Sequence, residues 1–84
     1  MNKPLTNKEL LALQPGTTIW IVTKPGSFNI PEPELIKETL HSTCKYMRSI
    51  KVSVHGHAYM YLTRYRWFFT NYWAARRWAR KHPQ

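Results

Sequence analysis

The chain has 84 residues, of which 43% are hydrophobic and 14% aromatic, and its formal net charge is +9. This length supports one domain, residues 1–84, and no second core. The apolar content excludes a disordered tail, and no apolar run approaches the roughly 20 residues that cross a bilayer. The N-terminal sequence lacks the uncharged stretch of a secretory signal. With one cysteine, Cys44, we expect a soluble, cytoplasmic protein in which this thiol is buried.

The positive charge is confined to the second half of the chain. Residues 1–38 contain four Lys and four Glu, whereas residues 39–84 contain nine Lys and Arg and no acidic residue. This asymmetry indicates a polyanionic or acidic partner. A basic, solvated surface that only maintains solubility is the alternative.

The first predicted elements are a short helix and a buried strand. Thr6 and Glu9 have the spacing of a capping box, which predicts a helix over residues 7–13. After a Pro-Gly break, the β-branched residues 17–23 predict a strand. The side chains of this strand should alternate between two faces, with Ile19 and Ile21 on one and Trp20 and Val22 on the other. A loop over residues 24–33 follows.

The middle of the chain predicts further strands. Residues 34–41 fit either one turn of helix or an alternating strand, and we favour the strand. The alternation in residues 50–62 predicts a hairpin with its turn at residues 55–57. A break is expected at residues 63–65, because otherwise arginines would enter the core. One face of these strands carries Met60, Leu62 and Phe68. If that face is buried, the other face forms an exposed aromatic row, which consists of Tyr59, Tyr61, Tyr65 and Trp67.

The last predicted element is a helix with Thr70 as its N-cap and Pro83 after its end. At about 100° per residue, its inward stripe consists of Ala74, Ala75, Trp78 and His82. Its opposite face consists of Tyr72, Trp73, Arg76, Arg77 and Arg80. Rings among guanidinium groups are suited to stacking on bases and neutralising phosphates, or to a protein hot spot. The alternative is that Tyr72 or Trp73 packs back against the strands.

Two motifs give the chain a resemblance to known proteins. Leu-x-Pro-Gly-Thr-x-Ile-Trp-x-Val occupies residues 13–22, and Trp-Phe-Phe-Thr-x-x-x-Ala occupies residues 67–74. With the order of elements, they resemble a broad group of small phage and bacterial proteins that look like Src-homology-three barrels closed by a C-terminal helix. The group commonly has acidic residues just before Ala74, where this chain has Tyr72 and Trp73. The resemblance implies an α+β fold, a phage-like intracellular origin and no particular activity.

We therefore expect the α+β class, as a small twisted antiparallel β-barrel or sheet with a short N-terminal helix and a C-terminal helix. No catalytic site is predicted, because the chain has no Asp and Cys44 with His41 forms no nucleophile motif. His55 and His57 are too few for a metal site without a third ligand such as His41. We expect no enzymatic activity, no cofactor, no metal and no small-molecule substrate.

The expected function is a small basic binding module. Nucleic acid, bound largely without sequence preference, is the first choice of partner. The alternative is a phage-encoded inhibitor or regulator that docks on an acidic patch of a host protein, in the cytoplasm of a bacterial host. Attachment to an anionic membrane is a weaker third candidate. The expected contact residues are Arg76, Arg77, Arg80, Lys81, Tyr72, Trp73, Arg64 and Arg66.

Overall fold

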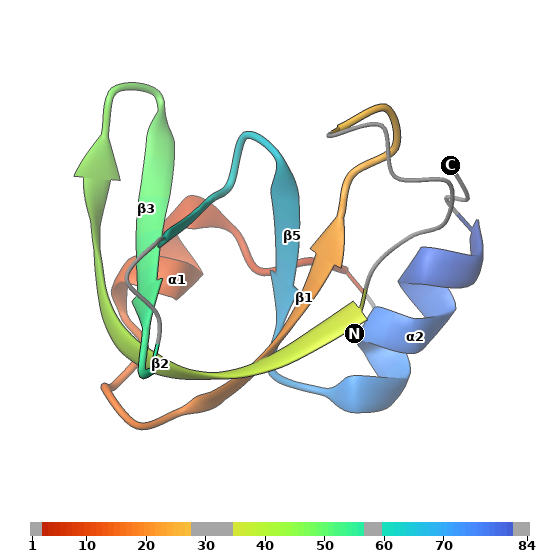
Figure 1. Ribbon diagram of the computed structural model, residues 1–84, viewed down its shortest axis with the longest axis horizontal. Coiled ribbons are helices and arrows are strands. Elements are labelled where there is room, and N and C mark those ends of the chain that lie inside the picture. The colour runs from red at the N-terminus through yellow and green to blue at the C-terminus, as the bar shows by residue number, and fades with distance from the viewer. Residues whose placement is uncertain (1–2, 28–34, 57–59, 82–84) are drawn as a thin grey trace.

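A computed structural model describes residues 3–27, 35–56 and 60–81 (Figure 1). The elements are α1 (Asn7–Leu11), β1 (Thr18–Thr23), β2 (Leu35–Tyr46), β3 (Ser49–Val54), β4 (Met60–Leu62), β5 (Arg66–Phe69) and α2 (Tyr72–Lys81). All strand pairs are antiparallel, in the spatial order β4-β3-β2-β1-β5. The expected α+β class, with a short N-terminal helix and a C-terminal helix, is confirmed. In the described part of the chain, neither helix is long and apolar enough to cross a membrane.

Helix α1 begins with the predicted capping box. The Thr6 amide donates to Glu9 Oε1 at 2.8 Å, and the Glu9 amide donates to Thr6 Oγ1 at 3.2 Å. These hydrogen bonds lower the pKa of the Glu9 carboxyl. The helix ends at Leu11, two residues earlier than predicted, and it buries Leu10 in the core.

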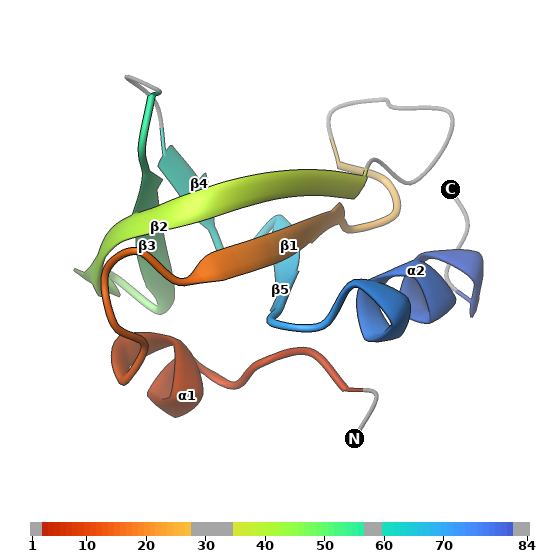
Figure 2. The same ribbon diagram turned by 90° about the horizontal axis from the view of Figure 1, so that it is seen from below.

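Strand β2 bends, so that it belongs to both halves of the sheet. Its first half pairs with β1, its second half pairs with β3, and the register shifts between Leu40 and Ser42. A bulge of this kind bends and twists a strand, and Figure 2 shows β2 as an arc. The strand favoured for residues 34–41 is confirmed from Leu35 onward, and its continuation to Tyr46 was not predicted.

Only residues 63–65 separate β4 from β5, although these strands lie at opposite edges of the sheet order. This connection spans at most about 15 Å, whereas the edges of such a sheet, if flat, would be about 19 Å apart. The sheet therefore bends until its edges approach. The Thr63 amide donates to Ile50 O of β3 at 3.1 Å, and the Lys24 amide, just after β1, donates to Tyr65 O at 2.9 Å.

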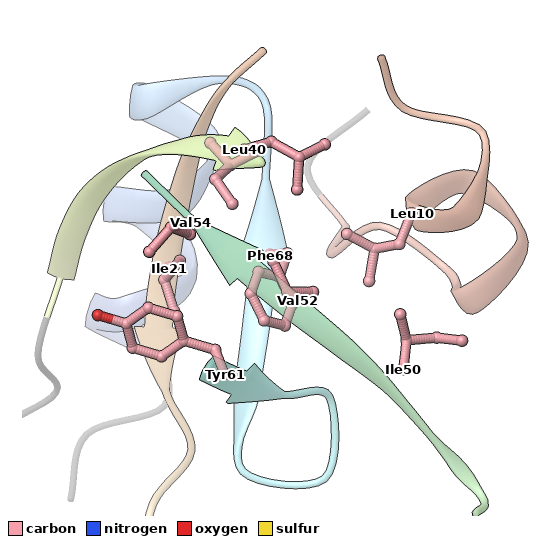
Figure 3. Close-up of a cluster of buried hydrophobic side chains, with 9 residues drawn as sticks. Leu10, Ile21, Leu40, Ile50, Val52, Val54, Tyr61 and Phe68 are labelled. Carbon is pink, nitrogen blue, oxygen red and sulfur yellow. The ribbon is translucent and has the colours of Figure 1, made fainter. Parts of the chain in front are cut away.

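The main core lies between the two halves of the bent sheet. Figure 3 shows side chains that converge on it from the strands and from α1. The buried members are Leu10, Ile19, Ile21, Leu40, Ile50, Val52, Val54, Tyr61 and Phe68. The predicted alternation of β1 is confirmed, because Ile19 and Ile21 belong to this core whereas Val22 and Trp20 pack in a second cluster under α2.

The pairing of β3 with β4 forms as predicted, and residues 57–59 lie outside the described residues. The exposed tyrosine row does not form. Tyr61 is 4% exposed and its hydroxyl donates to Glu38 Oε2 at 3.0 Å, whereas Met60 is 45% exposed. The predicted break at residues 63–65 occurs and resets the alternation, so that Tyr61 and Phe68 both face the core. Tyr59 lies outside the described residues.

A second hairpin turn, between β2 and β3, was not predicted. Tyr46 pairs with Ser49, which leaves Met47 and Arg48 as the two turn residues. Met47 has a φ of 56° and is 90% exposed. The left-handed region costs a residue other than glycine roughly 1–2 kcal/mol, and glycine or asparagine is usual there. The turn therefore holds an exposed apolar side chain at a position that favours glycine.

The predicted burial of Cys44 is wrong. Its neighbour Thr43 faces α1 and donates from Oγ1 to Leu10 O at 3.4 Å, so that Cys44, on the opposite face of β2, is exposed to solvent. The prediction was based on composition alone. In the structure, α1 covers only the face of β2 that carries Thr43, so the face that carries Cys44 remains in solvent.

Exposure of Cys44 predicts its reactivity. A water-soluble disulfide reagent should modify the native protein at close to the rate of the unfolded chain. Cys44→Ser should change the free energy of unfolding by less than ~0.5 kcal/mol. Modification that requires denaturant would contradict this placement.

The N-cap of α2 is Asn71 and not the predicted Thr70. Asn71 Oδ1 accepts a hydrogen bond from the Ala74 amide at 3.0 Å, and Asn71 O accepts one from the Ala75 amide at 3.1 Å. Asparagine and threonine are both good caps, and the helix starts one residue later than the sequence pattern indicated.

Two matched substitutions test this cap. Asn71→Ala should lower the free energy of unfolding by about 1 kcal/mol, because it leaves an amide at the helix start without its acceptor. Thr70→Ala, at an exposed position outside the helix, should change it by less than ~0.5 kcal/mol. Denaturant titrations of both variants measure the difference, and a larger effect at Thr70 would mean that Thr70 is the cap.

Candidate functional site

Helix α2 lies against β1 and β5 (Figure 2). Ala74 and Ala75 are buried with Val22 and Phe69, and larger rings surround them, among them Trp78. Alanine has only a methyl side chain, so the helix backbone lies close to the sheet. The predicted inward stripe is confirmed for Ala74, Ala75 and Trp78, and His82 lies outside the described residues.

The outward face of α2 is basic and carries one exposed indole. Trp73 is 60% exposed, and Arg76, Arg77 and Arg80 follow at spacings of three, four and seven residues, which places all four on one helix face. Arg77, Arg80 and Lys81 are exposed, and Arg76 is half-buried. No acidic residue lies in α2. We call Trp73, Arg76, Arg77, Arg80 and Lys81 the helix face. These residues concentrate positive charge around a solvent-exposed indole.

Tyr72 and Trp73 have different environments. Tyr72 is half-buried, and its ring packs edge-on against Trp20 of β1 with centroids 4.9 Å apart. The alternative that a ring packs back against the strands is therefore correct for Tyr72 and wrong for Trp73. Tyr72 still supports the exposed ring, because the Tyr72 and Trp73 centroids are 5.1 Å apart in a T-shaped arrangement.

Arg76 connects these two rings. Its Nη1 donates to the Tyr72 hydroxyl at 3.3 Å, and its Cζ lies 5.8 Å from the Trp73 centroid. A guanidinium group held over an indole is a cation–π contact of ~0.5–1 kcal/mol at an exposed site. Arg76 thus positions Trp73, while Arg77 and Arg80 point their charges to solvent.

The site extends onto the sheet through two residues that the sequence did not identify. Lys37 Nζ lies 5.5 Å from the Trp20 centroid, and the two residues are direct cross-strand partners in the β1 and β2 ladder. A continuous series therefore runs from Lys37 through Trp20 and Tyr72 to Trp73. Lys37 and Trp20 become neighbours only through the pairing of β1 with β2. A pattern within one segment of the sequence cannot indicate which residues of two strands will pair.

Arg64 and Arg66 belong to another part of the molecule. Arg64 Cζ lies 5.6 Å from the Tyr65 ring, and Arg66 Cζ lies 5.0 Å from the Tyr61 ring. Both arginines are at the junction of β4 and β5. Arg64 is exposed there and lines a groove with Lys24 and Arg48, whereas Arg66 is half-buried. The predicted set of contact residues therefore divides between two surfaces.

Two of the histidines considered as metal ligands are in contact. The His41 and His55 rings lie 5.1 Å apart in a T-shaped contact, and His57 lies outside the described residues. The part of the chain that the structure describes contains no group of three His, Cys, Asp or Glu residues arranged to hold a metal ion.

The two tryptophans of α2 should respond differently to truncation. Trp78 contacts Trp67 and Phe69 with centroids 5.4 and 6.2 Å away, and Trp78→Ala should lower the free energy of unfolding by about 3 kcal/mol. Trp73→Ala removes an exposed ring and should lower it by less than ~1 kcal/mol. Thermal or denaturant melts measure both values. Equal losses would show that Trp73 is a structural residue.

Comparisons with protein-family models, with curated proteins and with solved structures found no significant match to this chain. The resemblance to small Src-homology-three-like barrels, and the phage origin that it implies, therefore stay predictions. Any inference about function therefore depends on the geometry and charge of the exposed surfaces described above.

Proposed function

We propose that the protein is a non-enzymatic module that binds nucleic acid on the helix face, largely without sequence preference. The observation that carries the proposal is Trp73, which is 60% exposed among three arginines of the same face. Water contact around a large ring is unfavourable by roughly 25 cal/mol per Å² of apolar surface. A ring kept in water beside guanidinium groups is suited to a ligand that offers both flat faces and negative charge.

Nucleic acid is such a ligand. Arg77, Arg80 and Lys81 would meet phosphates, and Trp73 would stack on a base, a contact of ~1–3 kcal/mol. The packing of Tyr72 on Trp20, and of Arg76 on Trp73, holds the stacking ring in place before binding. Such preorganisation reduces the entropy lost on association.

Binding of this kind does not read sequence. Phosphate contacts fix position and affinity, and every base has a face on which an indole can stack. Specific readout needs hydrogen bonds from side chains to base edges, and the helix face offers mainly charge and one ring.

The rival function is the inhibitor or regulator that docks on an acidic patch of a host protein. Tryptophan and arginine dominate protein hot spots as well, so the same residues suit both partners. The rival gains support if the protein retains a protein partner after nuclease treatment and shows no affinity for nucleic acid.

We also propose that the bent sheet is a small barrel. The three-residue connection between its two edge strands supports this proposal, since it brings β4 and β5 toward each other. In such a barrel, α2 would lie on the outside of the wall formed by β1 and β5, where its basic face is accessible.

Salt dependence tests the proposed function. Fluorescence anisotropy with labelled single-stranded and double-stranded oligonucleotides should show affinity that falls steeply with salt, because several condensed counterions are released. Arg77→Ala with Arg80→Ala should lower the log-log salt slope by about 2. The same measurement on Lys3→Ala with Lys8→Ala, which removes equal charge at exposed positions outside the helix face and outside the groove lining, should give a smaller change.

Two results would contradict the proposal. One is the absence of binding even at low salt, and the other is equal weakening by the helix-face pair and by the control pair. The second result would mean that net charge alone, and no defined face, attracts the nucleic acid. Melts of both variants check that the fold is intact.

A further inference from the structure

A second basic surface extends from the β2–β3 turn, which is distant from α2, to the end of β1. An open groove of about 1150 Å³ runs between the β2–β3 turn and the β4–β5 turn. Its lining includes Lys24, Tyr46, Met47, Arg48, Arg64 and Tyr65. Figures 1 and 2 both place the end of β2 and the helix α2 on opposite sides of the molecule. The end of the groove at the β2–β3 turn is therefore distant from the helix face, whereas Lys24 at its other end lies 5.8 Å over the Trp67 ring, which packs against Trp78 of α2.

The charge of the groove has one sign. Three cations, Lys24, Arg48 and Arg64, line it, and no carboxylate does among the described residues. The acidic residues that the structure describes are Glu9 and Glu38, which accept hydrogen bonds from Thr6 and Tyr61 elsewhere. Desolvation lowers the pKa of Lys24, and a bound anion would offset that effect. The groove is thus electrostatically suited to an anionic ligand.

Aromatic and apolar groups accompany these cations. Tyr46 is 48% exposed at the edge of the groove, and Lys51 Nζ lies 5.9 Å from its ring. Tyr65 lies under the Arg64 guanidinium group. Rings beside cations are the combination that binds bases and phosphates together. In a duplex the faces of the bases are covered, so rings in a groove can stack only on unpaired bases.

The strained turn is a second, independent observation. Met47 keeps a φ of 56° where glycine would be unstrained, and its side chain is 90% exposed. Strained positions of this kind occur preferentially at binding sites. Here the turn places Met47 and Arg48 together on the rim of the groove. An apolar side chain next to a guanidinium group can contact the face of an unpaired base while the cation meets the adjacent phosphate.

We propose that this groove is a second contact for nucleic acid, one that takes a single strand, with Lys24, Arg48 and Arg64 on its phosphates and Tyr46 on a base. The inference rests on the proposed function and deepens it, because it names single strands as the preferred partner. The molecule measures 29 × 26 × 25 Å along its principal axes, so only a strand of several nucleotides can contact both surfaces at once. A long oligonucleotide therefore gains from both sites, and a short one occupies them independently.

The test uses NMR and anisotropy on the full chain. With an oligothymidylate of ~4 nucleotides, amide shifts should occur at residues 46–49 and 63–65 as well as at residues 72–81. In Arg48→Ala with Arg64→Ala, only the shifts of residues 72–81 should remain. With ~16 nucleotides, this variant should bind about tenfold more weakly and lose about 2 units of salt slope. Arg48→Lys with Arg64→Lys should retain most of the affinity.

The outcomes separate this inference from the proposed function. Shifts at residues 72–81 alone would overturn the second contact and leave the helix face as the site. Shifts at residues 46–49 and 63–65 alone would support the groove and overturn the helix face, and no shifts at all would overturn both. Equal binding of a duplex, or of polyglutamate with the same charge, would overturn the assignment of single strands. A thermal melt of the exposed Arg48 and Arg64 variants confirms their fold.

Discussion

The close packing of α2 on the sheet is the constraint on which the exposed surface depends. Ala74 and Ala75 leave little space between the helix and β1, so every large side chain of α2 must lie beside the contact or away from it. Trp78 lies beside it and adds to the apolar cluster. Trp73, one helix turn before Arg77, has no such place and remains in water. The exposure of the ring is thus a geometric result of small residues at the contact.

The bend of the sheet distributes the remaining charge. β2 carries residues of both halves, and its bulge turns the second half away from α2. The β2–β3 turn therefore ends far from the helix, and the connection from β4 to β5 comes to lie beside that turn. Both described carboxylates are engaged in hydrogen bonds that shape the fold, at the start of α1 and at the Tyr61 hydroxyl. Two basic regions remain, and among the described residues neither has an acidic residue on its surface.

The sequence predicted the features that depend on local patterns. The Thr6 capping box, the two faces of β1, the break before β5 and the inward stripe of α2 all follow from spacing along the chain. The features it missed depend on contacts between distant segments. Cys44 is exposed because α1 covers only the other face of β2, and Lys37 reaches Trp20 only through strand register. The turn at Met47 was missed because its sequence lacks the glycine that usually marks such a turn.

The choice of arginine on both surfaces determines which contacts they can make. A guanidinium group offers five N–H donors in a fixed planar fork, so Arg77, Arg80, Arg48 and Arg64 suit phosphate groups by geometry as well as by charge. Lys24 differs, because burial already lowers its pKa, and it is the groove cation that alkaline conditions would neutralise first. Under the proposed function, competing polyanions or a rise in ionic strength would release a bound nucleic acid from both surfaces.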